Sequence, residues 1–297
     1  MSSGGSIRPR ALLVVLILTW AVSWPVIKVG VTNVSPLWYA CLRYQIAAIC
    51  LFTLVVIRRE FVFPSRPDWP LVIVSGAFQM GAYSALTSLA LTILPPGRAS
   101  VLAFSTPLWV VPLAAWRLNE HVSRCAMLGV GLGLLGVLAV AAPSLHSSRS
   151  DQLVAYAMLL GAAAVWAVTI VFVRSHRFTA SALSLAPWQM LVAAALLLPL
   201  AMTVERRPAS IGVSGVASLA YVGPVATAFA YWAIVESGRH LRASAMSMAL
   251  LATPCLGILI SAMTLGETVG TSLVAGVVMI GAGIRLATMS SHSSGAA

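Results

Sequence analysis

The sequence predicts an all-α membrane protein in which ten transmembrane helices form two inverted-topology five-helix repeats around a central cavity. Three observations lead to this fold class. The composition is that of a chain surrounded by lipid, its apolar stretches are long enough to span a membrane, and its second half repeats the first. Of the 297 residues, 60% are hydrophobic and only 8% are charged, whereas charged residues make up about 25% of an ordinary soluble domain.

Long apolar stretches alternate with short polar segments along the chain. A helix needs about 20 apolar residues to cross the hydrocarbon core of a bilayer. Ten stretches approach that length, and we expect spans at 11–31, 37–57, 70–92, 99–116, 124–142, 153–173, 181–203, 212–235, 243–264 and 269–288. The first stretch is too long for a cleavable signal, because Trp20, Trp24 and Lys28 lie inside a full-length helix.

Basic residues set the expected orientation of these spans. With the N-terminus in the cytoplasm, twelve arginines fall in cytoplasmic segments and five basic residues fall on the opposite side. This positive-inside bias predicts a multi-pass protein of the inner (plasma) membrane with both termini cytoplasmic. The formal net charge of +11 then reflects orientation and contact with membrane lipids, and we expect no nucleic-acid partner.

The two halves of the chain repeat each other at a nearly constant offset. Thr106-Pro107 recurs 147 residues later as Thr253-Pro254, and "WAV" at 20–22 recurs 146 residues later at 166–168. Such an offset indicates a duplicated unit.

The repeat divides the chain into units at 1–146 and 147–297. Each unit holds five spans, an odd number, so the second unit enters the membrane from the opposite face. Secondary transporters are often built this way, with the substrate site between the repeats. Glu120 and its counterpart Glu267 stand at the expected start of each unit's last helix, where a carboxylate complements the helix dipole.

Prolines mark the expected helix kinks. A proline inside a helix removes a backbone hydrogen bond and bends the helix. Pro25 is expected to interrupt the first span, Pro107 the fourth and Pro254 the ninth. These kinks suit helices that move during gating, and static curvature around a packed bundle is the alternative for any single proline.

Several ordered motifs carry a family resemblance. They are the five-span halves, the "W-A-V…K" and "W-A-V…R" openings, "Pro36-Leu-Trp…Leu42-Arg43-Tyr44", and "A-S…T-P…L-x-E…G" in each half. In these features the chain resembles the drug/metabolite transporter superfamily and its EamA-type exporters, most closely the aromatic amino acid exporters of the YddG type. The resemblance implies ten helices, both termini inside, a central cavity and export of small metabolites.

Proton-binding side chains are missing from the centres of the predicted spans. All seven carboxylates and all five histidines fall in loops or at span ends. A proton-coupled antiporter commonly uses a buried Asp, Glu or His, so we expect a facilitator without tight proton coupling. No base is placed to activate a nucleophile in the membrane, and no P-loop motif binds ATP. The sequence therefore predicts a protein that is not an enzyme and has no cofactor or metal site.

Arg43 is the basic residue that lies well inside a predicted span. An arginine at that depth is costly and usually faces protein or water. It is either a counter-charge for a carboxylate on the solute, or a side chain that reaches the headgroups or a neighbouring carbonyl.

Aromatic and polar side chains inside the spans are the other candidates for a solute site. Indole and phenyl rings stack on flat solutes, and Gln79 and Tyr83 share a helix face because they are four residues apart. The complete candidate set is Trp20, Trp24, Arg43, Phe78, Gln79, Tyr83, Phe104, Trp109, Trp166, Tyr221 and Tyr231. Core packing is the alternative for any one of these aromatic residues.

Small residues recur in the fifth and tenth spans, for example Gly129, Gly133 and Gly283. Such residues let helices approach closely, whether in a dimer, between these two spans, or between each span and its own bundle.

Together these observations predict an alternating-access exporter of small amphipathic metabolites, foremost aromatic and neutral amino acids. Its partners would be the small-molecule substrate and membrane lipids, without an obligatory protein partner. Three alternatives remain: a broad drug or quaternary-amine exporter, a membrane-embedded enzyme acting on a lipid-linked substrate, and a structural subunit. Quaternary amines would favour an aromatic cage and disfavour Arg43.

Overall fold

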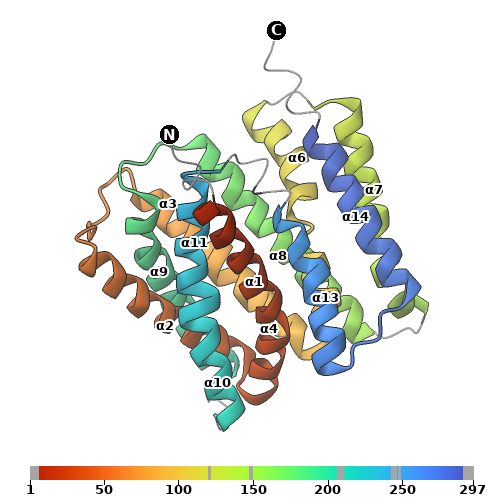
Figure 1. Ribbon diagram of the computed structural model, residues 1–297, viewed down its shortest axis with the longest axis horizontal. Helices are drawn as coiled ribbons and strands as arrows, with labels where there is room; N and C mark the ends of the chain where they lie inside the picture. The colour runs from red at the N-terminus through yellow and green to blue at the C-terminus, as the bar shows by residue number, and fades with distance from the viewer. Residues whose placement is uncertain are drawn as a thin grey trace.

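The computed structural model describes residues 7–119, 122–146, 150–205, 211–241, 246 and 249–289. This part of the chain is helical and contains no strand. The helices stand side by side in one bundle, and the first helix begins at the same end of it at which the last helix finishes (Figure 1). We call this the terminal end of the bundle and the other the opposite end.

The helical segments follow the predicted spans in chain order. They are α1 (Ile7–Asn33), α2 (Pro36–Ile57), α3 (Trp69–Val74), η2 (Ser75–Ala82), α4 (Tyr83–Ile93), α5 (Pro96–Ala103), α6 (Thr106–Leu118), α7 (Arg124–His146), α8 (Ser150–Ser175), α9 (Ala182–Val204), α10 (Val213–Tyr221), η3 (Val222–Phe229), α11 (Ala230–Gly238), α13 (Ala252–Leu265) and α14 (Thr271–Met289). Within the described ranges, eight continuous helical stretches are long and apolar enough to cross a membrane. The two last predicted spans fall on shorter apolar helices, Ala252–Leu265 and Thr271–Ala287.

Two of the membrane-length helices contain a π-helical segment. One is η2, between α3 and α4, and the other is η3, between α10 and α11. Each is eight residues long, and η3 begins at Val222, 147 residues after Ser75, where η2 begins. The internal offset seen in the sequence therefore recurs in the backbone. A π segment widens the helix and shifts the phase of every side chain that follows, and such segments are frequent at functional sites.

Two of the three expected interruptions at proline are present. The predicted span 99–116 begins earlier, at Pro96, and is broken at Phe104 and Ser105 just before Thr106 and Pro107 start α6. Pro254 stands in the first turn of α13, directly after a turn at Leu251. A proline in a first turn loses no intrahelical hydrogen bond.

Helix α1 runs through Pro25 without a break, and the kink expected at that residue stays a prediction. The carbonyl of Ala21, four residues earlier, lies beside Gly257 of α13. Membrane helices tolerate a proline where a neighbouring helix shields the freed carbonyl, and the tight packing of α13 on α1 supplies that neighbour.

Glycines join α7 and α14, which stand together at one side of the bundle (Figure 1). A Cβ atom on Gly129 would lie 2.6 Å from the carbonyl oxygen of Gly283, and one on Gly136 would lie 2.8 Å from that of Gly276. The glycine pattern therefore serves contact between these two helices, whose backbones approach closely where side chains are absent.

Two carboxylates cap helices at the opposite end of the bundle. Glu205, after α9, accepts hydrogen bonds from the amides of Leu37 (3.0 Å) and Trp38 (3.2 Å) in the first turn of α2. Glu267 accepts hydrogen bonds from the amides of Gly97 (2.7 Å) and Arg98 (3.2 Å) in the first turn of α5. Both capped helices begin with proline, so each carboxylate binds the first two free amides.

Glu267 therefore does cap the start of a helix, as predicted, but the prediction named the wrong helix. Glu267 caps α5, whereas α14 begins four residues further along, at Thr271. The sequence shows which residues precede a helix but not which other helix end packs beside them. Glu120, its counterpart, lies outside the described residues.

Asp68 joins two loops at the terminal end. Its buried carboxylate accepts hydrogen bonds from the hydroxyl of Ser65 (2.6 Å) and from the amide (2.7 Å) and hydroxyl (2.8 Å) of Thr179, just before α9. Burial alone would raise the pKa of Asp68, but these hydrogen bonds outweigh it and hold the pKa well below its ordinary range.

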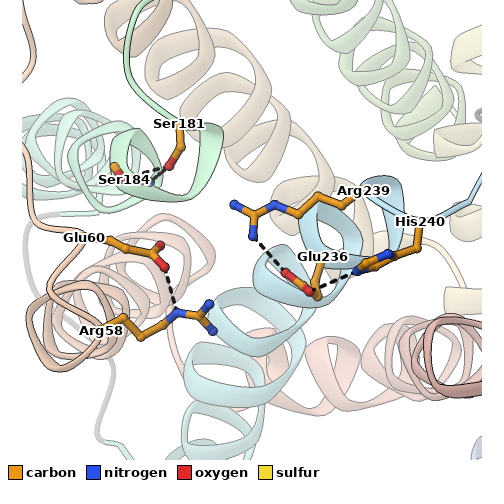
Figure 2. A network of polar contacts seen from close by, with 7 residues as sticks. All are labelled: Arg58, Glu60, Ser181, Ser184, Glu236, Arg239 and His240. Carbon is orange, nitrogen blue, oxygen red and sulfur yellow. Dashed lines mark hydrogen bonds and ion pairs between the residues drawn. The ribbon is translucent and has the colours of Figure 1, made fainter. Parts of the chain in front are cut away.

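Ion pairs gather at the same end, where α2 and α11 finish and α9 begins (Figure 2). Arg58 Nε lies 3.1 Å from Glu60 Oε1, and Glu236 contacts both Arg239 (3.2 Å) and His240 (3.5 Å). These carboxylates are at helix ends, as the sequence predicts, and not at the centre of the bundle.

Candidate functional site

A cavity of about 150 Å³ lies among the central parts of the helices. A cavity of this volume accommodates an aromatic ring, as an engineered apolar cavity of about 150 Å³ binds benzene. Both π segments and the break before α6 contribute to the wall. Its lining residues are Trp20, Ser23, Trp24, Ile27, Arg43, Tyr44, Gln79, Met80, Tyr83, Thr87, Leu91, Phe104, Trp166, Met190, Ala226, Thr227, Tyr231 and Ile234.

Most of the predicted site residues come together in this cavity, although they are spread over much of the sequence. Eight of the eleven candidates line it: Trp20, Trp24, Arg43, Gln79, Tyr83, Phe104, Trp166 and Tyr231. The structure places the other three elsewhere.

Phe78, Trp109 and Tyr221 do not line the cavity. Phe78 is 41% exposed on the outer side of η2, because it directly precedes the cavity residue Gln79 and adjacent helical residues point in different directions. Trp109 lines a separate apolar groove between α6 and α8. The Tyr221 hydroxyl donates to the carbonyl of Thr19 at 3.0 Å, which ties α10 to α1.

Aromatic rings form much of the cavity wall. Tyr83 and Trp166 meet edge to face, with ring centroids 4.8 Å apart and planes at 81°. Trp24 and Phe104 lie 6.4 Å apart at 57°. The Trp20 indole is fixed by a hydrogen bond from Nε1 to the carbonyl of Ala226 at 3.2 Å. Such tilted contacts are favourable ring geometries and hold the side chains in place, so the wall offers preformed apolar surfaces to a flat solute.

Arg43 supplies the positive charge of the cavity wall. Its Nε donates to the hydroxyl of Thr227 at 2.7 Å, and its guanidinium carbon lies 5.4 Å from the centroid of the Tyr44 ring. The side chain therefore turns into the bundle toward η3. Intramembrane arginines of this kind face protein or a water-filled cavity.

Neutral polar groups complete the wall. The Tyr231 hydroxyl donates to Gln189 Oε1 at 3.3 Å, and the Thr87 hydroxyl donates to the carbonyl of Tyr83 at 2.8 Å. Gln79 adds a carboxamide. The described lining residues include no Asp, Glu, His or Lys, so no carboxylate in this wall competes for the guanidinium of Arg43.

Ten lining residues were absent from the predicted set: Ser23, Ile27, Tyr44, Met80, Thr87, Leu91, Met190, Ala226, Thr227 and Ile234. Helical periodicity carried a signal for some of them. Ser23 and Ile27 share a face with Trp20 and Trp24 at the spacing i, i+3, i+4, i+7. Thr227 and Ile234 likewise lie four residues before and three residues after the candidate Tyr231, at the same helical spacing.

Comparison with known proteins gives one family and several relatives. The model of the EamA-like transporter family matches residues 10–142 and again residues 153–289. The probable amino-acid metabolite efflux pump of Salmonella typhimurium is 28% identical over 93% of this chain and 92% of its own length. The probable terminal-alkyne amino-acid exporter of Streptantibioticus cattleyicolor is 27% identical over 90% of this chain and 91% of its own length.

A solved structure supports the fold. A crystal structure described only as that of a protein aligns with a TM-score of 0.64 at 21% sequence identity. The alignment covers 96% of this chain and 97% of the other.

Proposed function

Because this chain belongs to the EamA-like transporter family, we propose that it is an inner-membrane exporter of small amphipathic metabolites, foremost aromatic and neutral amino acids. Two relatives are named as efflux proteins for amino acids or their metabolites, and the cavity suits such solutes. The observation that carries the proposal is the combination of the Tyr83–Trp166 and Trp24–Phe104 pairs with Arg43 in one cavity. The rings receive a flat or apolar side chain, and the guanidinium receives the negative end of the solute.

Transport proceeds by alternating access between two inverted five-helix units, 1–146 and 147–297, that together form ten membrane spans. The equal spacing of η2 and η3, and of the breaks before Pro107 and Pro254, supports two units of one design. Inverted units give inward-open and outward-open states of similar energy, with the substrate site between them. With both termini cytoplasmic, the terminal end of the bundle faces the cytoplasm.

The transporter acts as a facilitator without tight proton coupling. The described cavity wall has no carboxylate or histidine, and an arginine does not release its proton at accessible pH. Solute then moves down its own concentration gradient, and export follows from accumulation inside the cell.

Counterflow in proteoliposomes tests this function. Vesicles are loaded with unlabelled phenylalanine or tryptophan, labelled solute is added outside, and uptake is measured with and without a pH gradient. We expect transient accumulation that does not depend on the gradient. Uptake that requires the gradient would contradict the facilitator mechanism, and uptake of quaternary amines in place of amino acids would favour a drug exporter.

A further inference from the structure

The hydroxyl of Thr227 holds Arg43 in one orientation. Arg43 Nε donates to Thr227 Oγ1 at 2.7 Å, and that oxygen in turn donates its own hydrogen to the carbonyl of Val222 at 2.8 Å. Because the threonine proton is already used, the oxygen presents lone pairs to Arg43 and acts as an acceptor. The side chain of Thr227 is only 7% exposed, which restricts it to this arrangement.

The π-helical backbone makes the contact possible. Thr227 and Val222 are five residues apart within η3, which is the spacing of a π-helical hydrogen bond. Gly223, in the same segment, lets α2 approach: a Cβ atom there would lie 2.7 Å from the Ile46 side chain and 3.6 Å from the Arg43 carbonyl oxygen. Helix α2 and segment η3 are thus close enough for Arg43 to reach Thr227.

The two terminal nitrogens of Arg43 remain available to a solute. Among the described residues, no carboxylate pairs with Arg43 and no side chain accepts a hydrogen bond from these nitrogens. With Nε occupied, the free edge of the guanidinium presents two parallel N–H groups, a geometry that matches a carboxylate. An arginine at membrane depth without an anionic partner is a candidate ligand site.

We propose that Thr227 is a positioning residue: its hydroxyl holds Nε of Arg43, so that the two terminal nitrogens of Arg43 face a carboxylate on the solute. The transporter therefore selects amphipathic solutes with a free carboxylate and discriminates against their amides and amines. This inference rests on the proposed function and specifies its substrate class. We call Arg43 together with Thr227 the carboxylate anchor. These two residues belong to different predicted units, so the carboxylate anchor is complete only while α2 and η3 are in contact.

Binding of three related probes to the detergent-purified protein tests the inference. The probes are phenylalanine, phenylalaninamide and phenethylamine, which share the ring but differ in the carboxylate. Binding is read from the intrinsic fluorescence of the cavity tryptophans, and we expect phenylalanine to bind about 10-fold more tightly than the amide or the amine.

Thr227→Val removes the hydroxyl at nearly constant shape, and Thr227→Ser retains it. We expect Thr227→Val to weaken phenylalanine binding about 10-fold while leaving both other probes unchanged, and Thr227→Ser to keep the preference. Equal weakening of all three probes by Thr227→Val would indicate a merely structural role and overturn the inference. An unchanged preference in Thr227→Val, or no saturable binding of any probe, would overturn it as well.

Counterflow with the same probes separates this inference from the proposed function. Thr227-dependent binding of phenylalanine without any counterflow would contradict transport but retain the carboxylate anchor. Equal counterflow of phenylalanine and phenethylamine, unaffected by Thr227→Val, would retain transport and refute the anchor. Unchanged elution and unfolding temperature of both Thr227 variants confirm that they are folded.

Discussion

The Glu267 carboxylate lies 2.7 Å from the backbone amide of Gly97, a residue 170 positions earlier in the chain. A Cβ atom on residue 97 would lie 2.6 Å from Glu267 Oε2, so any larger residue there would require the carboxylate to shift. Burial raises the pKa of Glu267, although the amides of Gly97 and Arg98 and the charges of Arg98 and Lys28 act in the opposite direction. One side chain therefore fixes the loop after α13 to the start of α5.

Replacing Glu267 with alanine is expected to destabilise the protein by about 0.5–2 kcal/mol, the usual effect of removing a helix cap. The first free amides of α5 would lose their acceptor. Thermal and denaturant unfolding in detergent micelles measure the loss. Glu236→Ala is the matched control, because it removes a partly exposed ion pair whose contribution is about 0–1 kcal/mol. Equal losses in the two variants would contradict a specific capping role.

Stability should depend on the ionisation of Asp68. Its pKa is lower in the folded protein than in the unfolded chain, so its stabilising contribution is complete above the ordinary pKa of about 3.9 and is lost as the pH falls through the folded pKa. Asp68→Asn should lower the unfolding temperature at neutral pH, and its difference from the wild type should shrink as the pH falls below about 4. Unfolding temperatures in detergent across this range measure the effect.

Ser65→Ala gives a graded control for Asp68. It removes the 2.6 Å hydrogen bond from the Ser65 hydroxyl but keeps the bonds from Thr179. Its difference from the wild type should be smaller than that of Asp68→Asn and should shrink over the same pH range. A difference that stays constant with pH in both variants would show that ionisation of Asp68 does not contribute.

The contact between α7 and α14 should depend on Gly283 and not on Gly281. A Cβ atom on Gly283 would lie 2.5 Å from the carbonyl oxygen of Gly129, whereas one on Gly281 would meet nothing within 4 Å. Gly283→Ala should cost about 1–3 kcal/mol through overpacking. Gly281→Ala should be neutral or stabilising by up to about 1 kcal/mol, because alanine favours the helix. Unfolding in detergent compares the two, and similar losses would refute the close approach.

Trp166 should contribute to the affinity for aromatic solutes. Trp166→Ala removes the edge-to-face partner of Tyr83 and should raise the KM for phenylalanine counterflow by about 2- to 10-fold, since such ring contacts contribute about 0.5–1.5 kcal/mol. Trp116→Ala is the control, because that indole is 77% exposed on α6. A larger effect in Trp116→Ala would place the solute outside the cavity.

The sequence alone predicts the helical membrane fold and the order of its spans, because hydrophobicity and length are properties of each local stretch. The offset between Thr106-Pro107 and Thr253-Pro254 also predicts that the fourth and ninth spans are interrupted at equivalent positions of the two repeated units. Arg43, Trp166 and the other cavity-lining candidates can be named because charged, polar and aromatic residues are conspicuous within apolar spans.

The tertiary structure decides what those residues contact. The sequence places Phe78 beside Gln79, but only the path of η2 directs one outward and the other into the cavity. It places Glu267 before α14, but only the packing of the bundle brings it to α5. The contact between Arg43 and Thr227 likewise depends on η3 lying against α2. Spans follow from local composition, whereas these contacts join residues more than a hundred positions apart and exist only once the helices have packed.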